Sequence, residues 1–300
     1  MNAEQIKRQA MEMEFFLSRI DPIEVVNRIS RFRSLNIQSL SDQELSQEIL
    51  NTLLINNMFV YMTNNGTYPE KSYFFRVRKL KSSVISEMGF FSLSDFWEPP
   101  QKCVEKYGRL NKIGESLLYT SPCNPNVAIK EMRLKENDWY ALIRYSATKE
   151  IKVNIIGGVY DYDKMGFTDK KAVLIHELYN SYLRDEFSRE VGEGTEYLYR
   201  VSESIAKNYF DLPREVQDAW CYSSVQDKQQ CNVCFRPDVA HELLRLDGAM
   251  ICKKEKDDEI RPRCIAIASE KTGKAEFYQL GTEMQRKIFP EIKVFDDLNQ

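Results

Sequence analysis

The hydrophobic periodicity of the chain changes near residue 70, and this change limits the folds that the chain can adopt. Before it, apolar residues recur at helical spacing. This helical series comprises Leu40, Leu45, Ile49, Leu53 and Leu54. After it, Ser72–Arg78 alternates and is rich in aromatic residues, which is typical of a strand. Helices followed by many strands favour an α+β fold over a parallel sheet wound on both faces.

Local signals divide the chain into an N-terminal helical extension over residues 1–68 and a larger domain over residues 69–300. Asp21-Pro22 is a helix start, and Ser41 with Glu44 forms a capping box. The turn-rich segment Thr63–Pro69 marks the boundary. The apolar stripes of the extension are expected to pack on the following domain, with a dimer or partner surface as the alternative.

The larger domain is predicted to have a mixed-strand core with surrounding helices. Alternating segments predict strands at Trp139–Ala147, Ile151–Ile156, Cys264–Ser269 and Glu276–Leu280, and two more within Ala219–Phe235. Helical periodicity predicts amphipathic helices at Asp169–Phe187 and Thr195–Phe210. His176 and His241 have no partner motif, so packing or surface roles are expected for both.

Charge and cysteine content exclude several classes of protein. The net charge of −3 gives no broad basic field for nucleic acid. No apolar run approaches the roughly 18 residues of a membrane span, and no secretory pattern is visible at the N-terminus. Seven cysteines, an odd number, fit reduced thiols in the cytoplasm. Cys231 and Cys234 lack a second ligand pair, so no metal site is predicted.

The stretch Tyr107–Arg133 contains the residue types that suit a nucleotide. Arg109 lies in a turn-rich loop with two glycines, where a guanidinium beside flexible backbone suits phosphate. A short strand is expected at Ser116–Ser121, and Asn124-Pro125 then predicts a helix start.

Periodicity on that helix directs Glu131 inward. At about 100° per residue, Val127, Ala128, Glu131 and Met132 fall within one arc. A buried carboxylate is costly unless it is paired or used. A structural ion pair with an arginine and a catalytic acid are therefore both open hypotheses for Glu131.

Four separated segments, taken in order, resemble the RES domain family, which is named for its arginine, glutamate and serine. They are FFRVR with Arg76, GRLN with LLYTS, AIKEMR with Glu131, and WCYSSV with Ser224, followed by Asn232. The resemblance covers about residues 72 to 235. Gln229 and Gln230 depart from the pattern, since related chains tend to carry glycines there.

The resemblance implies an enzyme that consumes NAD as its substrate, with a fold similar to ADP-ribosyltransferase toxins. Many such proteins are the toxin of a toxin–antitoxin pair, so an inhibitory antitoxin is an expected partner. Cleaving the nicotinamide–ribose bond develops positive charge on the sugar, for which Glu131 is the candidate carboxylate. Arg76 and Arg109 are the candidate ligands of the pyrophosphate.

Three further residues complete the expected site. Tyr119 would pack on a ring or a ribose, with a core tyrosine as the alternative. Ser224 would contact the substrate through its hydroxyl, and no G-x-S-x-G elbow marks it as a hydrolase nucleophile. A pair of turn hydroxyls is the structural alternative for Ser223 and Ser224. Asn232 would orient the loop or a ribose.

The acceptor of the ADP-ribosyl group decides the name of the reaction. Inorganic phosphate would make the enzyme an NAD phosphorylase and water a glycohydrolase; we expect one of these two. A protein acceptor would make it an ADP-ribosyltransferase, and a catalytically silent NAD-binding module is a further alternative. A nucleic-acid-cleaving toxin would need a basic patch, which the sequence lacks.

Overall fold

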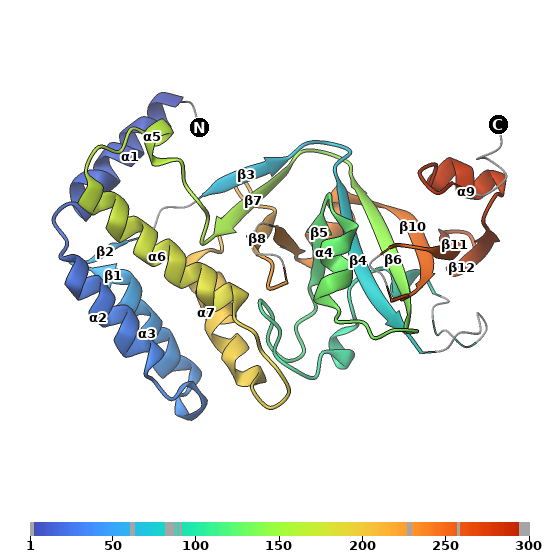
Figure 1. The fold of residues 1–300 in the computed structure, drawn as a ribbon, viewed down its shortest axis with the longest axis horizontal. Coiled ribbons are helices and arrows are strands. Elements are labelled where there is room, and N and C mark those ends of the chain that lie inside the picture. The colour runs from blue at the N-terminus through green and yellow to red at the C-terminus, as the bar shows by residue number, and fades with distance from the viewer. Residues whose placement is uncertain are drawn as a thin grey trace. The chain divides into compact units, whose positions relative to one another are not determined.

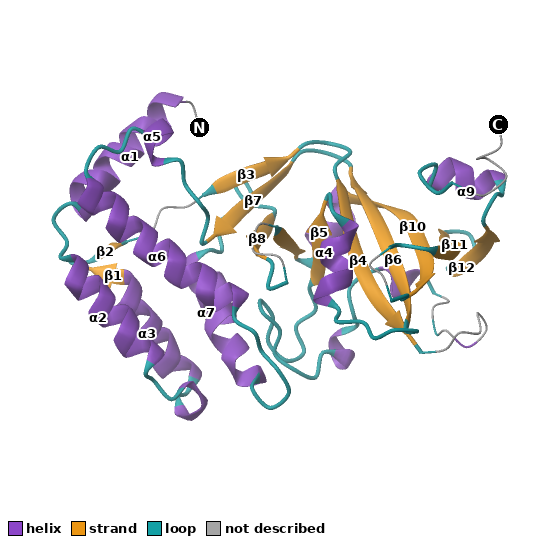
Figure 2. Cartoon of the chain, in the orientation of Figure 1, coloured by secondary structure: helices purple, strands orange, loops and turns teal. Residues whose placement is uncertain are grey.

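The computed structural model describes residues 3–60, 64–81, 87, 89, 92–226, 230–256 and 259–293. The chain forms two compact units, each assembled from segments that are far apart in sequence. The first unit contains Met1–Gly66, Glu105–Glu115 and Val153–Lys228, and the second contains Thr67–Val104, Ser116–Lys152 and Gln229–Gln300. Helices and a mixed set of strands together confirm the predicted α+β class (Figure 2).

The first unit consists mainly of helices. They are α1 (Ala3–Leu17), α2 (Pro22–Arg33), α3 (Asp42–Leu53), α5 (Tyr162–Met165), α6 (Lys170–Ser188) and α7 (Tyr199–Tyr209). Short strands β1 (Leu54–Ile55) and β2 (Met58–Phe59) form a hairpin. The strands β8 (Ala219–Ser223), β7 (Ile151–Ile156) and β3 (Asn65–Tyr68) follow one another in a sheet, and the unit includes β7 from Val153 and β3 as far as Gly66. The β7–β8 pairing is parallel. A 3₁₀ turn at Glu196–Leu198 replaces the first turn of the helix predicted from Thr195.

Helices from both ends of the first unit's sequence pack on one another. Figure 1 shows α6 alongside α1 and α2, while α3 lies beside α7, and each of these pairs is in contact. Leu45, Ile49 and Leu53 are buried, so the stripe of α3 packs within the chain as predicted. The caps at Asp21 and Ser41 are also confirmed, the second as a full capping box with Glu44.

An antiparallel sheet forms most of the second unit. Its order is β12-β11-β10-β6-β4-β5-β9, and every neighbouring pair is antiparallel. The strands are β4 (Tyr73–Leu80), β5 (Leu118–Pro122), β6 (Trp139–Ala147), β9 (Cys231–Phe235), β10 (Leu244–Lys253), β11 (Pro262–Ser269) and β12 (Lys274–Gln279). Its helices are α4 (Pro125–Glu131), α8 (Pro237–Leu243) and α9 (Glu283–Ile288), with 3₁₀ turns at Leu93–Phe96 and Gln101–Cys103.

One face of this sheet forms a hydrophobic core with α4. Phe75 and Val77 of β4 belong to the same buried cluster as Ala128 and Ile129 of α4. Strand alternation therefore assigns Phe75 and Val77 to the α4 face and their neighbour Arg76 to the opposite face. No helix among the described residues has the length and apolar character needed to cross a membrane.

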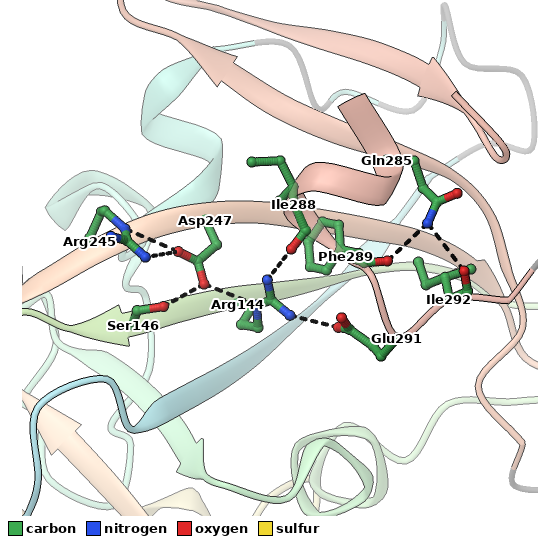
Figure 3. A network of polar contacts seen from close by, with 9 residues as sticks. All are labelled: Arg144, Ser146, Arg245, Asp247, Gln285, Ile288, Phe289, Glu291 and Ile292. Carbon is green, nitrogen blue, oxygen red and sulfur yellow. Dashed lines mark hydrogen bonds and ion pairs between the residues drawn. The ribbon is translucent and has the colours of Figure 1, made fainter. Parts of the chain in front are cut away.

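A buried arginine on β6 fastens the C-terminal segment to the sheet (Figure 3). Arg144 is 6% exposed. Its Nε donates to Asp247 Oδ2 at 3.0 Å and its Nη1 to Glu291 Oε1 at 2.6 Å. Its Nη2 donates to the carbonyl of Ile288. The guanidinium carbon also lies 4.4 Å from the ring centre of Phe289, so two carboxylates, a carbonyl and a ring face surround the cation.

Replacing Arg144 with methionine should destabilise the protein by about 3–5 kcal/mol, because the change leaves the buried carboxylate of Asp247 with only the exposed Arg245 as a cation. Arg245→Met is the matched control, since Arg245 also binds Asp247 but its side chain is 70% exposed. The control should cost at most about 1 kcal/mol. Urea unfolding of both variants measures these differences, and equal losses would show that burial is not what makes Arg144 important.

His176 on α6 is a second buried polar residue. Its burial agrees with the packing role expected from the sequence. Its Nδ1 lies 3.0 Å from the hydroxyl of Tyr162. Burial lowers the pKa of the His176 ring from 6.5 to about 4, because the charged imidazolium loses its hydration. The ring is therefore neutral in the folded protein at neutral pH.

Stability should depend on pH through His176. Between about pH 6.5 and pH 4 the unfolded state binds a proton that the folded state does not, so this contribution is lost as pH falls. The pKa difference corresponds to about 3 kcal/mol. Glu186 and Glu203, whose pKa values burial raises, act with the opposite sign. The measurement is therefore the difference in unfolding free energy between the wild type and His176→Phe, which should move in favour of the variant from pH 7 to pH 4. A constant difference would contradict the assignment.

Candidate functional site

Glu131, Asn232 and Ser121 form a hydrogen-bonded chain in the second unit. Asn232 Nδ2 on β9 donates to Glu131 Oε1 at 3.0 Å. Ser121 on β5 donates its hydroxyl to Asn232 Oδ1 at 2.9 Å. A hydroxyl donor on the amide oxygen leaves the NH₂ group directed at the carboxylate. Asn232 and Ser121 are both buried, so the two strands hold Glu131 in a defined orientation.

Glu131 is the last residue of α4. The helix begins as predicted, with Pro125 at its first position and the side chain of Asn124 capping the Asn126 N–H. Val127 and Ala128 are buried as expected, but the placement of Met132 on the inner face is wrong, since Met132 is 41% exposed. The helix ends after Glu131, so the arc does not extend to the next residue. The carboxylate is half-buried at the edge of the apolar face.

Tyr119 shares the sheet face of Asn232 and Glu131. Phe75 pairs with Ser121, and Phe75 belongs to the cluster under α4. Residues two apart on a strand point to the same face, so Tyr119 lies on the face of Ser121. Its side chain is half-buried. The structure thus brings three of the predicted site residues to the α4 face of one sheet.

Arg76 lies on the other face of β4. It sits beside Tyr145 of β6; burial raises the pKa of the tyrosine, and the charge of Arg76 opposes that rise. The Nη1 atom of Arg76 is buried and has no hydrogen-bond partner within the described part of the chain. Because the strand separates Arg76 from α4, the structure does not bring Arg76 and Glu131 to the same face.

Other polar groups of the second unit lie near Tyr145. Its hydroxyl donates to the carbonyl of Phe96. Trp97 contacts the ring of Tyr145 and also stacks on His241, with ring centres 4.2 Å apart in the second pair. His241 Nε2 lies 3.1 Å from Glu98 Oε1. His241 is exposed, and its contact with the Glu98 carboxylate was not predicted from the sequence.

The other two predicted site residues belong to the first unit. Arg109 is buried, and its Nη2 donates to the carbonyl of Arg189 at 3.1 Å. Its guanidinium carbon lies 5.0 Å from the ring centre of Tyr199. Ser224 is fully buried, and its hydroxyl oxygen accepts from the backbone N–H of Gln226 at 3.2 Å, as a turn hydroxyl does. A substrate contact stays a prediction for both residues.

The loop after Ser224 is only partly described. Gln229, one of the two positions that depart from the RES pattern, lies outside the described residues, whereas Gln230 is half-buried. In the ranges that the structure covers, no cluster of three or more histidine, cysteine or acidic side chains is arranged to hold a metal.

Comparisons of the chain with protein-family models, with curated proteins and with solved structures found no match. The resemblance to the RES family therefore rests on the segments around Arg76, Arg109, Glu131 and Ser224. Two residues of the polar networks, Ser121 and Arg144, were not predicted from the sequence. Arg144 carries a signal, because it is the sole charged residue of Trp139–Ala147, and a charge within an apolar strand points to a buried ion pair.

The contacts of Arg109 predict a structural role that can be measured. Arg109→Met should lower the unfolding free energy by about 1–3 kcal/mol, since two backbone carbonyls lose their donor. Arg8→Met on α1, whose side chain is 76% exposed, should stay within about 0.5 kcal/mol of the wild type. Chemical denaturation measures both. Unchanged stability with weakened NAD binding would instead assign Arg109 to the substrate phosphate.

Proposed function

We propose that this protein degrades NAD by cleaving the bond between nicotinamide and ribose, with Glu131 as the catalytic carboxylate. The observation that carries the proposal is the fixed orientation of Glu131 by Asn232, which Ser121 orients in turn. A carboxylate acts on charge developing in a transition state only if it is held in place beforehand. The order of the RES-like segments supports NAD as the substrate.

The proposed cleavage of NAD uses two side chains of the protein, Glu131 and Tyr119. The bond between the ribose carbon and the pyridinium nitrogen breaks, and its electron pair leaves with nicotinamide. The sugar becomes oxocarbenium-like, and the negative charge of Glu131 stabilises it. The acceptor, phosphate or water, then supplies an oxygen to the same carbon. Tyr119 on the same sheet face offers a ring surface for the nicotinamide or the ribose.

The finer description of the fold and the biological setting belong to the same proposal. The second unit is proposed to be an ADP-ribosyltransferase-like core, in keeping with the RES resemblance. An enzyme of this kind would deplete NAD in its own cytoplasm, so an inhibitory antitoxin that covers the Glu131 face is proposed as the partner. Arg109 stays a candidate for the pyrophosphate, which the Arg109→Met variant tests, and Arg76 stays a candidate that would bind from the face opposite Glu131.

Glu131→Gln tests the role of the charge, because it keeps the shape of the side chain and removes the negative charge. Nicotinamide release should fall by about 10²-fold or more, while NAD binding changes little. The melting temperature should hold or rise, since a half-buried charge is neutralised. Glu136→Gln, an exposed residue in the loop after α4, is the matched control and should keep wild-type activity.

The alternative hypothesis for Glu131, a structural ion pair, gives the opposite result. It predicts a loss of about 3–5 kcal/mol in stability with turnover per folded molecule preserved. Running the assay with and without inorganic phosphate identifies the acceptor. A folded wild-type protein that releases no nicotinamide under either condition would favour the silent binding module.

A further inference from the structure

The second unit contains a cavity of about 670 Å³ that is separate from the Glu131 network. Its floor is formed by buried side chains of three neighbouring strands, Phe75, Leu142 and Met250. Neither Glu131 nor Asn232 lines it. The volume lies within the range of about 300–1,000 Å³ that is typical of small-molecule sites.

The C-terminal segment forms one wall of this cavity. Glu291 and Ile292 line it, and Figure 3 shows Glu291 beside Arg144 and Ile292 beside Gln285. The bond between Arg144 and Glu291 holds this wall against the sheet. Gln285 Nε2 donates to the carbonyls of Phe289 and Ile292 and so fixes the turn after α9. These internal hydrogen bonds therefore fix the position of the wall.

The charges on the cavity lining are unequal. Arg144, Arg261 and Lys293 are its cations and Glu291 is its acid, and Arg144 and Glu291 bind each other. The positive charge offered to a ligand thus comes from Arg261 and Lys293. Arg261 contacts Glu259 at 2.7 Å, but both side chains are exposed, and such a pair is weak enough for a ligand to replace.

We propose that the cavity binds an amphipathic anion, a small molecule with an apolar body and one carboxylate or comparable acidic group. The apolar body would cover Phe75, Leu142 and Met250, and the acidic group would meet Arg261 and Lys293 at the rim. A neutral ligand would gain the same apolar contacts without this attraction. A cationic ligand would be repelled by the two rim cations.

Three ligands with the same ten-carbon chain separate these contributions: decanoate, decanol and decyltrimethylammonium. Titration calorimetry below the micelle concentration should show decanoate binding about tenfold or more tightly than decanol, and no binding of the cation. The double variant Arg261→Glu with Lys293→Glu should lower the affinity for decanoate by about tenfold or more and leave the affinity for decanol unchanged. Lys271→Glu, an exposed lysine in the turn between β11 and β12, is the charge-matched control and should bind decanoate as the wild type does.

A substitution at the rim of the cavity tests whether the ligands bind in this cavity. Ile260→Trp places a large ring at the half-buried edge of the cavity and should weaken the binding of both decanoate and decanol. Circular dichroism and melting temperature must match the wild type for each variant compared. Failure of decanoate to bind the wild type, equal binding of all three ligands, or wild-type binding by the double variant would each overturn the proposal. Glu131→Gln should bind decanoate normally, so this result is independent of the NAD assay.

Discussion

The organisation of the second unit depends on the hydrogen bonds and ion pairs of one buried cation, Arg144. A guanidinium in the middle of an apolar strand is stable only if charge and hydrogen bonds surround it. Its partners come from β10 and from the C-terminal segment, 103 and 147 residues further along the chain. The ion pair between Arg144 and Glu291 therefore fixes the position of the C-terminal segment, and this segment forms one wall of the cavity.

Glu131 is held in a different way, and the difference bears on function. Two carboxylates surround Arg144 and offset its charge, whereas the amide of Asn232 orients Glu131 through a neutral donor. This hydrogen bond restricts the orientation of the Glu131 carboxylate. The half-buried position at the end of α4 also keeps the cost of desolvation lower than in a closed core. An oriented carboxylate of this kind suits the stabilisation of a transient cation.

Local structure was largely predictable, because caps and alternation depend on neighbouring residues. The strands Trp139–Ala147 and Ile151–Ile156 match the prediction at both ends, and the cap at Asn124 is correct. The partners of charged side chains were not predictable, because they are distant in sequence. The loop around Arg109 has the composition of a phosphate site, yet its donors bind carbonyls 77 and 80 residues away. A composition pattern does not distinguish a ligand phosphate from an internal carbonyl, since both accept the same hydrogen bonds.

The position of Arg76 shows where sequence order and geometry differ. Alternation correctly placed Arg76 opposite Phe75 and Val77, but it could not tell which of the two faces α4 would cover. Because α4 covers the face of Phe75, the guanidinium lies beside Tyr145, and Glu131 lies on the other side of the strand. The two residues that the RES resemblance joins in one site are thus separated by a backbone whose hydrogen bonds are used in the sheet. In the proposed reaction, Glu131 would act on the ribose from the α4 face, whereas Arg76 would reach a pyrophosphate only from the opposite face of the sheet.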